Sequence, residues 1–201
     1  MKNIITVQHT QSLHHTNGMV GSWTNWPLTE KGKADAARIA EKLAWELKGK
    51  TPVLYSSDLL RARQTAEPIW TALDVLPIFT PVLRERNFGS VCGKPVAYLR
   101  EFGAPETDVD SKMFPDAESR RDEWERLLPF FKMIEDCEND SIVIVSHGDL
   151  LSVFNAMFLG LPVESLESFE LFGSAGGVSH LQMTDSGKRF IRKLSDLSYY
   201  I

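Results

Sequence analysis

Two histidines of this chain each follow a short run of apolar, mostly β-branched residues. The run 4–7 precedes His9, and the run 142–145 precedes His147. Runs of this kind predict strands that are buried on both faces, as in parallel sheets. Ligands of open α/β sheets bind at the carboxyl ends of such strands. One histidine in this position is usually structural, but two in equivalent positions indicate a site where imidazole chemistry takes place.

Three other residues follow or open predicted elements at the same edge of the sheet. Arg61 lies about three residues into a helix, so its guanidinium can reach back toward a bound anion. An arginine in this position is as often simply solvated. Glu85 follows another predicted strand and, taken alone, is more typical of a surface carboxylate. Gly148 opens a helix directly after His147, so free backbone N–H groups and the positive helix end lie near that histidine.

The hydrophobic pattern predicts a single α/β domain over residues 1–201. Strands and helices alternate, which is typical of three layers: a mainly parallel sheet with helices on both faces. The expected strands are 4–7, 53–55, 78–83, 142–145, 178–183 and 189–194, and the expected helices are 29–48, 59–73, 118–135 and 150–159. Pro129 should kink the third helix or divide it in two.

The stretch from Ser90 to about Ala117 has no periodic pattern and is rich in Gly, Pro and mixed charge. It is too long for an ordinary connection, and long loops of compact domains often serve as lids or binding loops. We expect residues 90–117 to form a lid-like insertion over the site, lining the side on which a leaving group would lie.

The composition argues against several classes of function. The net charge of −5 provides no basic surface for nucleic acid or an acidic membrane. No apolar run approaches the length of a membrane span. Cys92 and Cys137 are too few for a disulfide framework and predict free thiols in a reducing compartment, so we expect a cytoplasmic protein. His14 and His15 are adjacent and lack a carboxylate cluster, so neither a metal site nor a cofactor is expected.

Four stretches of the chain resemble the motifs of a known family, in that family's order and spacing. They are PLTEKG at 27–32, YSSDLLRARQTA at 55–66, LRE at 83–85 with FG at 88–89, and VSHG at 145–148. Together they are similar to the histidine phosphatase superfamily, which includes the cofactor-dependent phosphoglycerate mutases and many small phosphatases. Each motif alone is weak, whereas four in order over nearly the whole length are specific.

The resemblance implies a role for four residues of this sequence. His9 would be the nucleophile, Arg61 the phosphate clamp, Glu85 the proton donor and His147 the second histidine of the phosphate pocket. An imidazole attacks phosphorus only when it is neutral, and a planar guanidinium fits two phosphoryl oxygens. Burial or a nearby phosphate should raise the pKa of the glutamate, so that it is protonated when the alkoxide leaves.

The chain departs from the family signature Arg-His-Gly, in whose place it has Gln8-His9-Thr10. Gln8 can donate a hydrogen bond but carries no charge, whereas Thr10 adds bulk and a hydroxyl group. His15 stands where relatives have an asparagine, and this histidine or its neighbour His14, if protonated, would restore part of the missing charge. The residues expected to bind substrate are Gln8, Thr10, His15, Arg61 and Gly148.

The retained residues predict a metal-independent phosphatase that acts through a phosphohistidine on a small phosphorylated metabolite. The altered signature keeps a second hypothesis open: a catalytically impaired protein that binds a phosphorylated ligand or regulates a partner. A mutase of the phosphoglycerate type ranks lower, since nothing in the sequence specifies a lid that keeps water from a phosphoenzyme. The pattern leaves the substrate and the oligomeric state open.

Overall fold

A computed structural model describes residues 1–201, which form one six-stranded sheet with the order β3-β2-β4-β1-β5-β6. The strands are β1 (Lys2–Gln8), β2 (Val53–Ser57), β3 (Pro77–Thr80), β4 (Ser141–Ser146), β5 (Val178–Met183) and β6 (Arg189–Asp196). β1 to β4 are parallel to one another, and β5 is antiparallel to both of its neighbours. The predicted mainly parallel sheet is confirmed.

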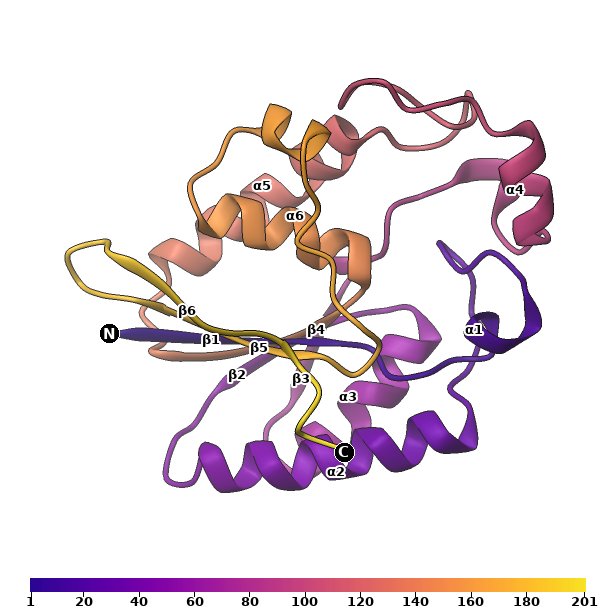
Figure 1. The fold of residues 1–201 in the computed structure, drawn as a ribbon. Coiled ribbons are helices and arrows are strands. Elements are labelled where there is room, and N and C mark those ends of the chain that lie inside the picture. Colours follow the sequence, from indigo (N-terminus) through magenta and orange to yellow (C-terminus); the bar gives the residue numbers. More distant parts are fainter.

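Helices cover both faces of the sheet, as predicted for a three-layer domain (Figure 1). One face carries α2 (Glu30–Glu46) and α3 (Leu60–Leu73), and the other carries α5 (Arg120–Asp136) and α6 (Gly148–Phe158). The short helices α1 (His14–Asn17) and α4 (Val96–Phe102) lie beyond the carboxyl end of β1. No helix of the chain combines the length and the apolar character that crossing a bilayer requires.

Both central strands are buried on both faces, because alternate side chains enter two different cores. On β1, Ile4 joins the core under α5 and α6, whereas Ile5 joins the core under α2 and α3. Ile142 and Val143 of β4 divide in the same way. In the register of this pair Gln8 lies opposite Ser146, so the residues that follow the two strands emerge side by side.

Two sequence predictions at prolines require correction. The expected strand 78–83 ends at Thr80, and 81–83 form a 3-10 helix. Pro81 has no N–H group to donate to the sheet, and the Thr80 side chain accepts from the N–H of Val82 instead. The division expected at Pro129 does not occur: α5 is continuous from a capping box at Ser119, and its second half is anchored by buried apolar side chains.

The segment 90–117 packs beside α1. It contains α4, and a bridge between Met19 and Pro95 ties it to the chain that follows α1. Glu106, near its end, pairs with the buried guanidinium of Arg86 at 2.6 Å. These contacts connect the segment to the chain after α1 and to Arg86, which follows the 3-10 helix at 81–83.

Truncation of a core phenylalanine should lower the stability of the fold strongly. Phe154 of α6 is fully buried, and its ring lies 5.3 Å from that of Phe131. We expect Phe154→Ala to reduce the free energy of unfolding by about 3–5 kcal/mol in urea titrations. The matched control is Phe102→Ala, whose side chain is 56% exposed and should change stability by less than about 0.5 kcal/mol. Equal losses in the two variants would contradict the packing described.

Candidate active site

A cavity of about 590 Å³ opens at the carboxyl ends of the strands. Five of its lining residues were predicted from the sequence to belong to the site, namely Gln8, His9, His15, Glu85 and Gly148. His14, Lys31 and Asp35 contribute to the wall as well. Arg61 and His147 are buried, with exposed fractions of 1% and 0%, and do not line the cavity themselves. Both lie next to His9, which does line it.

The imidazole of His9 is held as a neutral ring with its basic lone pair on Nε2. Its Nδ1–H donates to the carbonyl oxygen of Thr10 at 2.8 Å, which leaves the lone pair on Nε2. That lone pair accepts from Nε of Arg61 at 3.1 Å. Burial, followed by the charge of Arg61 and the neighbouring His15, holds the pKa of His9 well below its usual value. A neutral imidazole with its orientation set on both sides is suited to nucleophilic attack.

Arg61 brings a positive charge directly to the imidazole of His9. Its terminal nitrogens donate to the carbonyl oxygens of Ser22 at 2.8 Å and Thr24 at 2.9 Å. With the bond to His9, these contacts use three of the five N–H donors of a guanidinium. Burial lowers the pKa of Arg61 to about 10, so the side chain stays charged at neutral pH. Two N–H groups remain for a bound oxyanion.

His147 follows β4 and lies beside His9, with the ring centroids 5.1 Å apart. Its Nε2 shares a hydrogen bond of 2.8 Å with Oγ of Ser57, whereas its Nδ1 is buried without a hydrogen-bond partner. Burial and then the charge of Arg61 lower the pKa of His147 well below its usual value. Buried polar atoms in native folds almost always have a hydrogen-bond partner. A phosphoryl oxygen would supply one for Nδ1 of His147.

Glu85 places a carboxyl group on the cavity wall. Burial, followed by the nearby charge of Asp149, raises the pKa of Glu85 to about 7. Its Oε1 accepts from the backbone N–H groups of Leu150 at 3.2 Å and Arg86 at 3.3 Å. Since both bonds go to one oxygen, the other oxygen is left to carry the proton. Such a carboxyl group can protonate a leaving oxygen at neutral pH.

Ion pairs lock the elements around Glu85. Asp149 pairs with Arg120 and, at 3.1 Å, with Nε of Arg86. The two arginines flanking the glutamate point elsewhere, since Arg84 forms a bidentate pair with Asp58 and Arg86 pairs with Glu106. The carboxyl group of Glu85 is therefore the one group of this strand end that faces the cavity.

The remaining predicted residues occupy different environments. Gln8 lies between two glycines: a Cβ placed on Gly148 would come within 3.1 Å of its Nε2, and one on Gly173 within 3.1 Å of its Oε1. The Thr10 side chain is buried, and its hydroxyl donates to the carbonyl of Gly32 at 2.8 Å, so the structure does not bring it to the cavity. His15 is exposed at the cavity wall.

In the unliganded structure neither His14 nor His15 carries the charge that a protonated histidine would supply in place of the signature arginine. Burial, then the charges of neighbouring His15 and Arg61, lowers the pKa of His14 to about 3. Burial and Arg61 also lower the pKa of His15. Lys31 is the one lysine or arginine on the cavity wall, and it is paired with Asp35 at 2.5 Å. Arg61 is therefore the one cation beside His9 that is not paired with a carboxylate.

One wall of the cavity, which was not predicted from the sequence, consists of residues 172–175 and Tyr200. No residue of the segment 90–117 lines the cavity in this conformation. The N–H of Gly176 donates to the carbonyls of Gln8 at 3.1 Å and His9 at 3.2 Å, and the Tyr200 hydroxyl donates to the Ala175 carbonyl at 3.0 Å. The signal for this wall was the sequence GSAGG at 173–177, since Gly176 has a φ of 82° that favours glycine.

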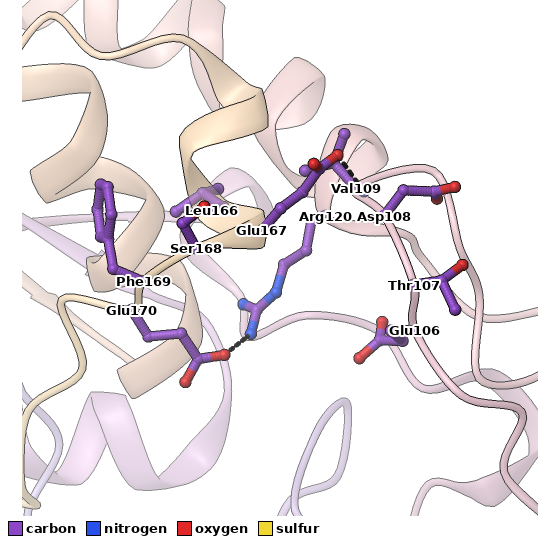
Figure 2. Close-up of a pocket in the computed structure, with 10 residues that line it drawn as sticks. All are labelled: Glu106, Thr107, Asp108, Val109, Arg120, Leu166, Glu167, Ser168, Phe169 and Glu170. Atoms are coloured by element: carbon purple, nitrogen blue, oxygen red, sulfur yellow. Dashed lines mark hydrogen bonds and ion pairs between the residues drawn. The ribbon is translucent and has the colours of Figure 1, made fainter.

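A second cavity, of about 350 Å³, lies on the far side of the Arg120–Asp149 pair. Figure 2 shows Arg120 directed toward Glu170, with which it forms an ion pair. The other charged residues on its wall are Glu106, Asp108 and Glu167. Four carboxylates around one paired arginine repel a phosphate group, so this acidic pocket is no alternative phosphate site.

The sequence profile of the histidine phosphatase superfamily (branch 1) matches residues 4–196. Together with the α/β sheet and the histidine pair at its carboxyl edge, this match covers nearly the whole chain. The chain belongs to the histidine phosphatase superfamily, as the sequence motifs predicted.

Relatives with assigned names are mutases and phosphatases. The 2,3-bisphosphoglycerate-dependent phosphoglycerate mutase of Bartonella henselae is 28% identical over 181 residues, which cover 85% of this chain and 87% of that protein. A putative phosphoserine phosphatase 2 of Hydrogenobacter thermophilus is 25% identical, with coverage of 96% and 97%.

Solved structures share the fold. A mycobacterial glucosyl-3-phosphoglycerate phosphatase superposes with a TM-score of 0.81 at 21% identity, covering 96% of this chain and 98% of that chain. YhfR of Bacillus stearothermophilus superposes with a TM-score of 0.83 at 23% identity, and the match covers both chains fully.

Proposed function

We propose that this protein is a phosphomonoester phosphatase that forms a phosphohistidine on His9. The observation that carries the proposal is the convergence of three buried side chains: Arg61 Nε lies 3.1 Å from His9 Nε2, and the ring of His147 lies 5.1 Å from that of His9 with its Nδ1 unpartnered. A phosphoryl group at this point would meet a nucleophile, a fixed positive charge and a vacant hydrogen-bonding atom. Positioning and charge compensation are what phosphoryl transfer requires of a protein.

In the first step, the Nε2 lone pair of His9 forms a bond to phosphorus while the ester P–O bond breaks. Glu85 transfers its proton to the departing oxygen. In the second step, water attacks the phosphorus, the N–P bond breaks and its electron pair returns to Nε2. The Glu85 carboxylate takes the proton from that water, which restores the starting state and releases inorganic phosphate.

The approaching phosphate completes the electrostatics of the site. Its negative charge raises the pKa of neighbouring imidazoles, so the Nδ1 atom of His147 becomes a donor to a phosphoryl oxygen. Arg61 donates its two remaining N–H groups to the equatorial oxygens. The names of these relatives include small phosphorylated molecules, and the cavity of about 590 Å³ has room for a metabolite of that size.

The direct test is chemical trapping of the intermediate. After brief incubation with a radiolabelled phosphomonoester, we expect label on His9 that is labile in acid and stable in alkali. Peptide mapping would locate it. The proposal fails if no label and no turnover are found with a broad panel of phosphomonoesters.

One observation supports the second function, a protein that binds a phosphorylated ligand with little turnover. Arg61 is the one unpaired cation at the nucleophile, and it donates to two backbone carbonyls besides His9. Gln8, at the position of the signature arginine, adds no charge. A hydrogen bond to a charged group is worth about 1.5–3 kcal/mol. A contact of this size that acts only in the transition state corresponds to about one to two powers of ten in rate.

Gln8→Arg distinguishes the two functions. If Gln8 represents a damaged site, the arginine should raise kcat by about 10- to 100-fold, because the side chain lines the cavity and the guanidinium adds charge to the transition state. Gln8→Lys is the matched control, as it restores charge without the planar fork. An unchanged or lower kcat would instead indicate a pocket adapted to another substrate.

A further inference from the structure

Three histidines from two separate elements meet at the mouth of the cavity. His9 follows β1, whereas His14 and His15 open α1. One ring nitrogen of each lies within 4.8 Å of the other two. The rings of His9 and His15 are stacked at 5.4 Å, and those of His14 and His15 are 4.0 Å apart. Two adjacent histidines rarely chelate one ion, but the fold adds the imidazole of His9 to this pair.

We propose that His9, His14 and His15 form a site for a divalent transition-metal ion of the Zn²⁺ type, and that the bound ion blocks the nucleophile. Neutral imidazole is a preferred ligand of Zn²⁺, Co²⁺, Ni²⁺ and Cu²⁺, whereas Mg²⁺ and Ca²⁺ prefer oxygen. Three histidines with an open fourth position are an established ligand set for Zn²⁺. Nothing in the family motifs calls for His14 or His15.

Hydrogen bonds outside the cluster already orient these rings. The hydroxyl of Ser12 bonds Nδ1 of His14 at 2.5 Å, which leaves Nε2 of that ring for a metal. The bond from Nδ1 of His9 to the Thr10 carbonyl does the same for the nucleophile. Metal-binding histidines almost always have their other ring nitrogen fixed in this way. The backbone N–H of Ser12 donates a long hydrogen bond, 3.3 Å, to Nδ1 of His15. This bond would break when the exposed His15 ring rotates to direct its lone pair at the ion.

The cluster must contract to hold an ion. Zn–N bonds of about 2.0–2.1 Å in tetrahedral geometry place the donor atoms roughly 3.3 Å apart, compared with separations of up to 4.8 Å in the structure. His15 is exposed and α1 has only four residues, so the two outer rings can close on the buried His9. The cavity leaves the fourth coordination position to water.

Electrostatics make this ion an inhibitor that can dissociate. Arg61 donates to the same Nε2 lone pair of His9 that the metal would take, and its positive charge opposes a dication. Glu85 lines the same cavity and, when ionised, offsets part of that repulsion. Since the metal and phosphorus compete for one lone pair, the metal-bound protein cannot form a phosphohistidine. This inhibitory effect rests on the proposed function, whereas metal binding itself does not.

Co²⁺ and Zn²⁺ are the probes for the test. We expect one Co²⁺ per chain with visible d–d absorption, displaced by Zn²⁺ and unaffected by Mg²⁺. His14→Asn, His15→Asn and His9→Asn should each weaken binding by at least about tenfold. His180→Asn, at a histidine outside the cavity, is the matched control and should bind like the wild type.

The possible results distinguish the metal site from the proposed phosphatase activity. Ser12→Ala, which keeps all three ligands but frees the His14 ring, should weaken Co²⁺ binding by about 10–100-fold. Zn²⁺ should also abolish turnover, and a chelator should restore it. The site is refuted if Co²⁺ does not bind at millimolar concentration, or if the three ligand variants bind as tightly as His180→Asn. A protein that binds Co²⁺ as described but has no turnover would support the metal site and refute the proposed phosphatase.

Discussion

His9→Asn should eliminate phosphoryl transfer. The asparagine keeps a polar side chain of similar size but has no basic nitrogen, so no N–P bond can form. Loss of a covalent nucleophile costs several powers of ten, and we expect kcat to fall by about 10⁴-fold or more. The acid-labile label should vanish together with turnover. Steady-state hydrolysis and trapping of the intermediate measure the two effects independently.

The control for this variant is His180→Asn. His180 on β5 is half-buried and shares a 2.6 Å hydrogen bond with Tyr199, away from the cavity. It should retain the label and the wild-type kcat. Substantial residual turnover in His9→Asn would show that another group attacks phosphorus, and the proposed role of His9 would then be wrong.

Glu85→Gln should produce the second-largest loss, and its size should depend on the leaving group. General acid catalysis contributes about 10²–10⁴-fold, so hydrolysis of an alkyl phosphate should slow by that factor. Hydrolysis of p-nitrophenyl phosphate should slow by less than about tenfold, because nitrophenolate leaves without a proton. The amide preserves the shape of the carboxyl group and its contacts with the N–H groups of Leu150 and Arg86. Equal losses on both substrates would contradict the acid role.

The pH dependence should identify the same residue. Glu85 has its pKa raised to about 7 by burial and by Asp149. The protonated form that the first step needs therefore predominates below that pH, and kcat/KM for alkyl phosphates, which reports the free protein and that first step, should decline as the pH rises through about 7. His9 does not produce an opposing limb in this range, because its pKa is lowered and it is already neutral. Glu85→Gln should remove the decline, and a profile unchanged by the substitution would assign it to another group.

Much of the architecture followed from local patterns. The apolar runs at 4–7 and 142–145 are too hydrophobic for anything but strands covered on both faces, and β1 and β4 are the central parallel pair. The strand predicted at 178–183 matches β5 residue for residue. The errors lie at prolines, where the loss of one N–H competes with packing: Pro81 ended a strand early, whereas core contacts carried α5 through Pro129.

The chemical types of the site residues were also visible in the sequence, because the carboxyl ends of parallel strands meet at one edge. What the sequence pattern could not predict is the protonation state and the hydrogen-bond partner of each group. The raised pKa of Glu85 depends on burial by segments that are remote in sequence, and Asp149 lies 64 positions away along the chain. The hydroxyl of Thr10, expected in the pocket, donates to Gly32 instead.

The sequence by itself determined the alternation of strands and helices, the family and the identity of the nucleophile, acid and guanidinium candidates, since periodicity and motif spacing are local properties. The tertiary structure alone decided which imidazoles lie together at the cavity and which of them are neutral. It brought His14 and His15 of α1 to His9, and it closed the cavity with residues 172–175 and Tyr200 rather than with 90–117. Desolvation and side-chain contact depend on segments far apart in the chain, so only the folded arrangement defines them.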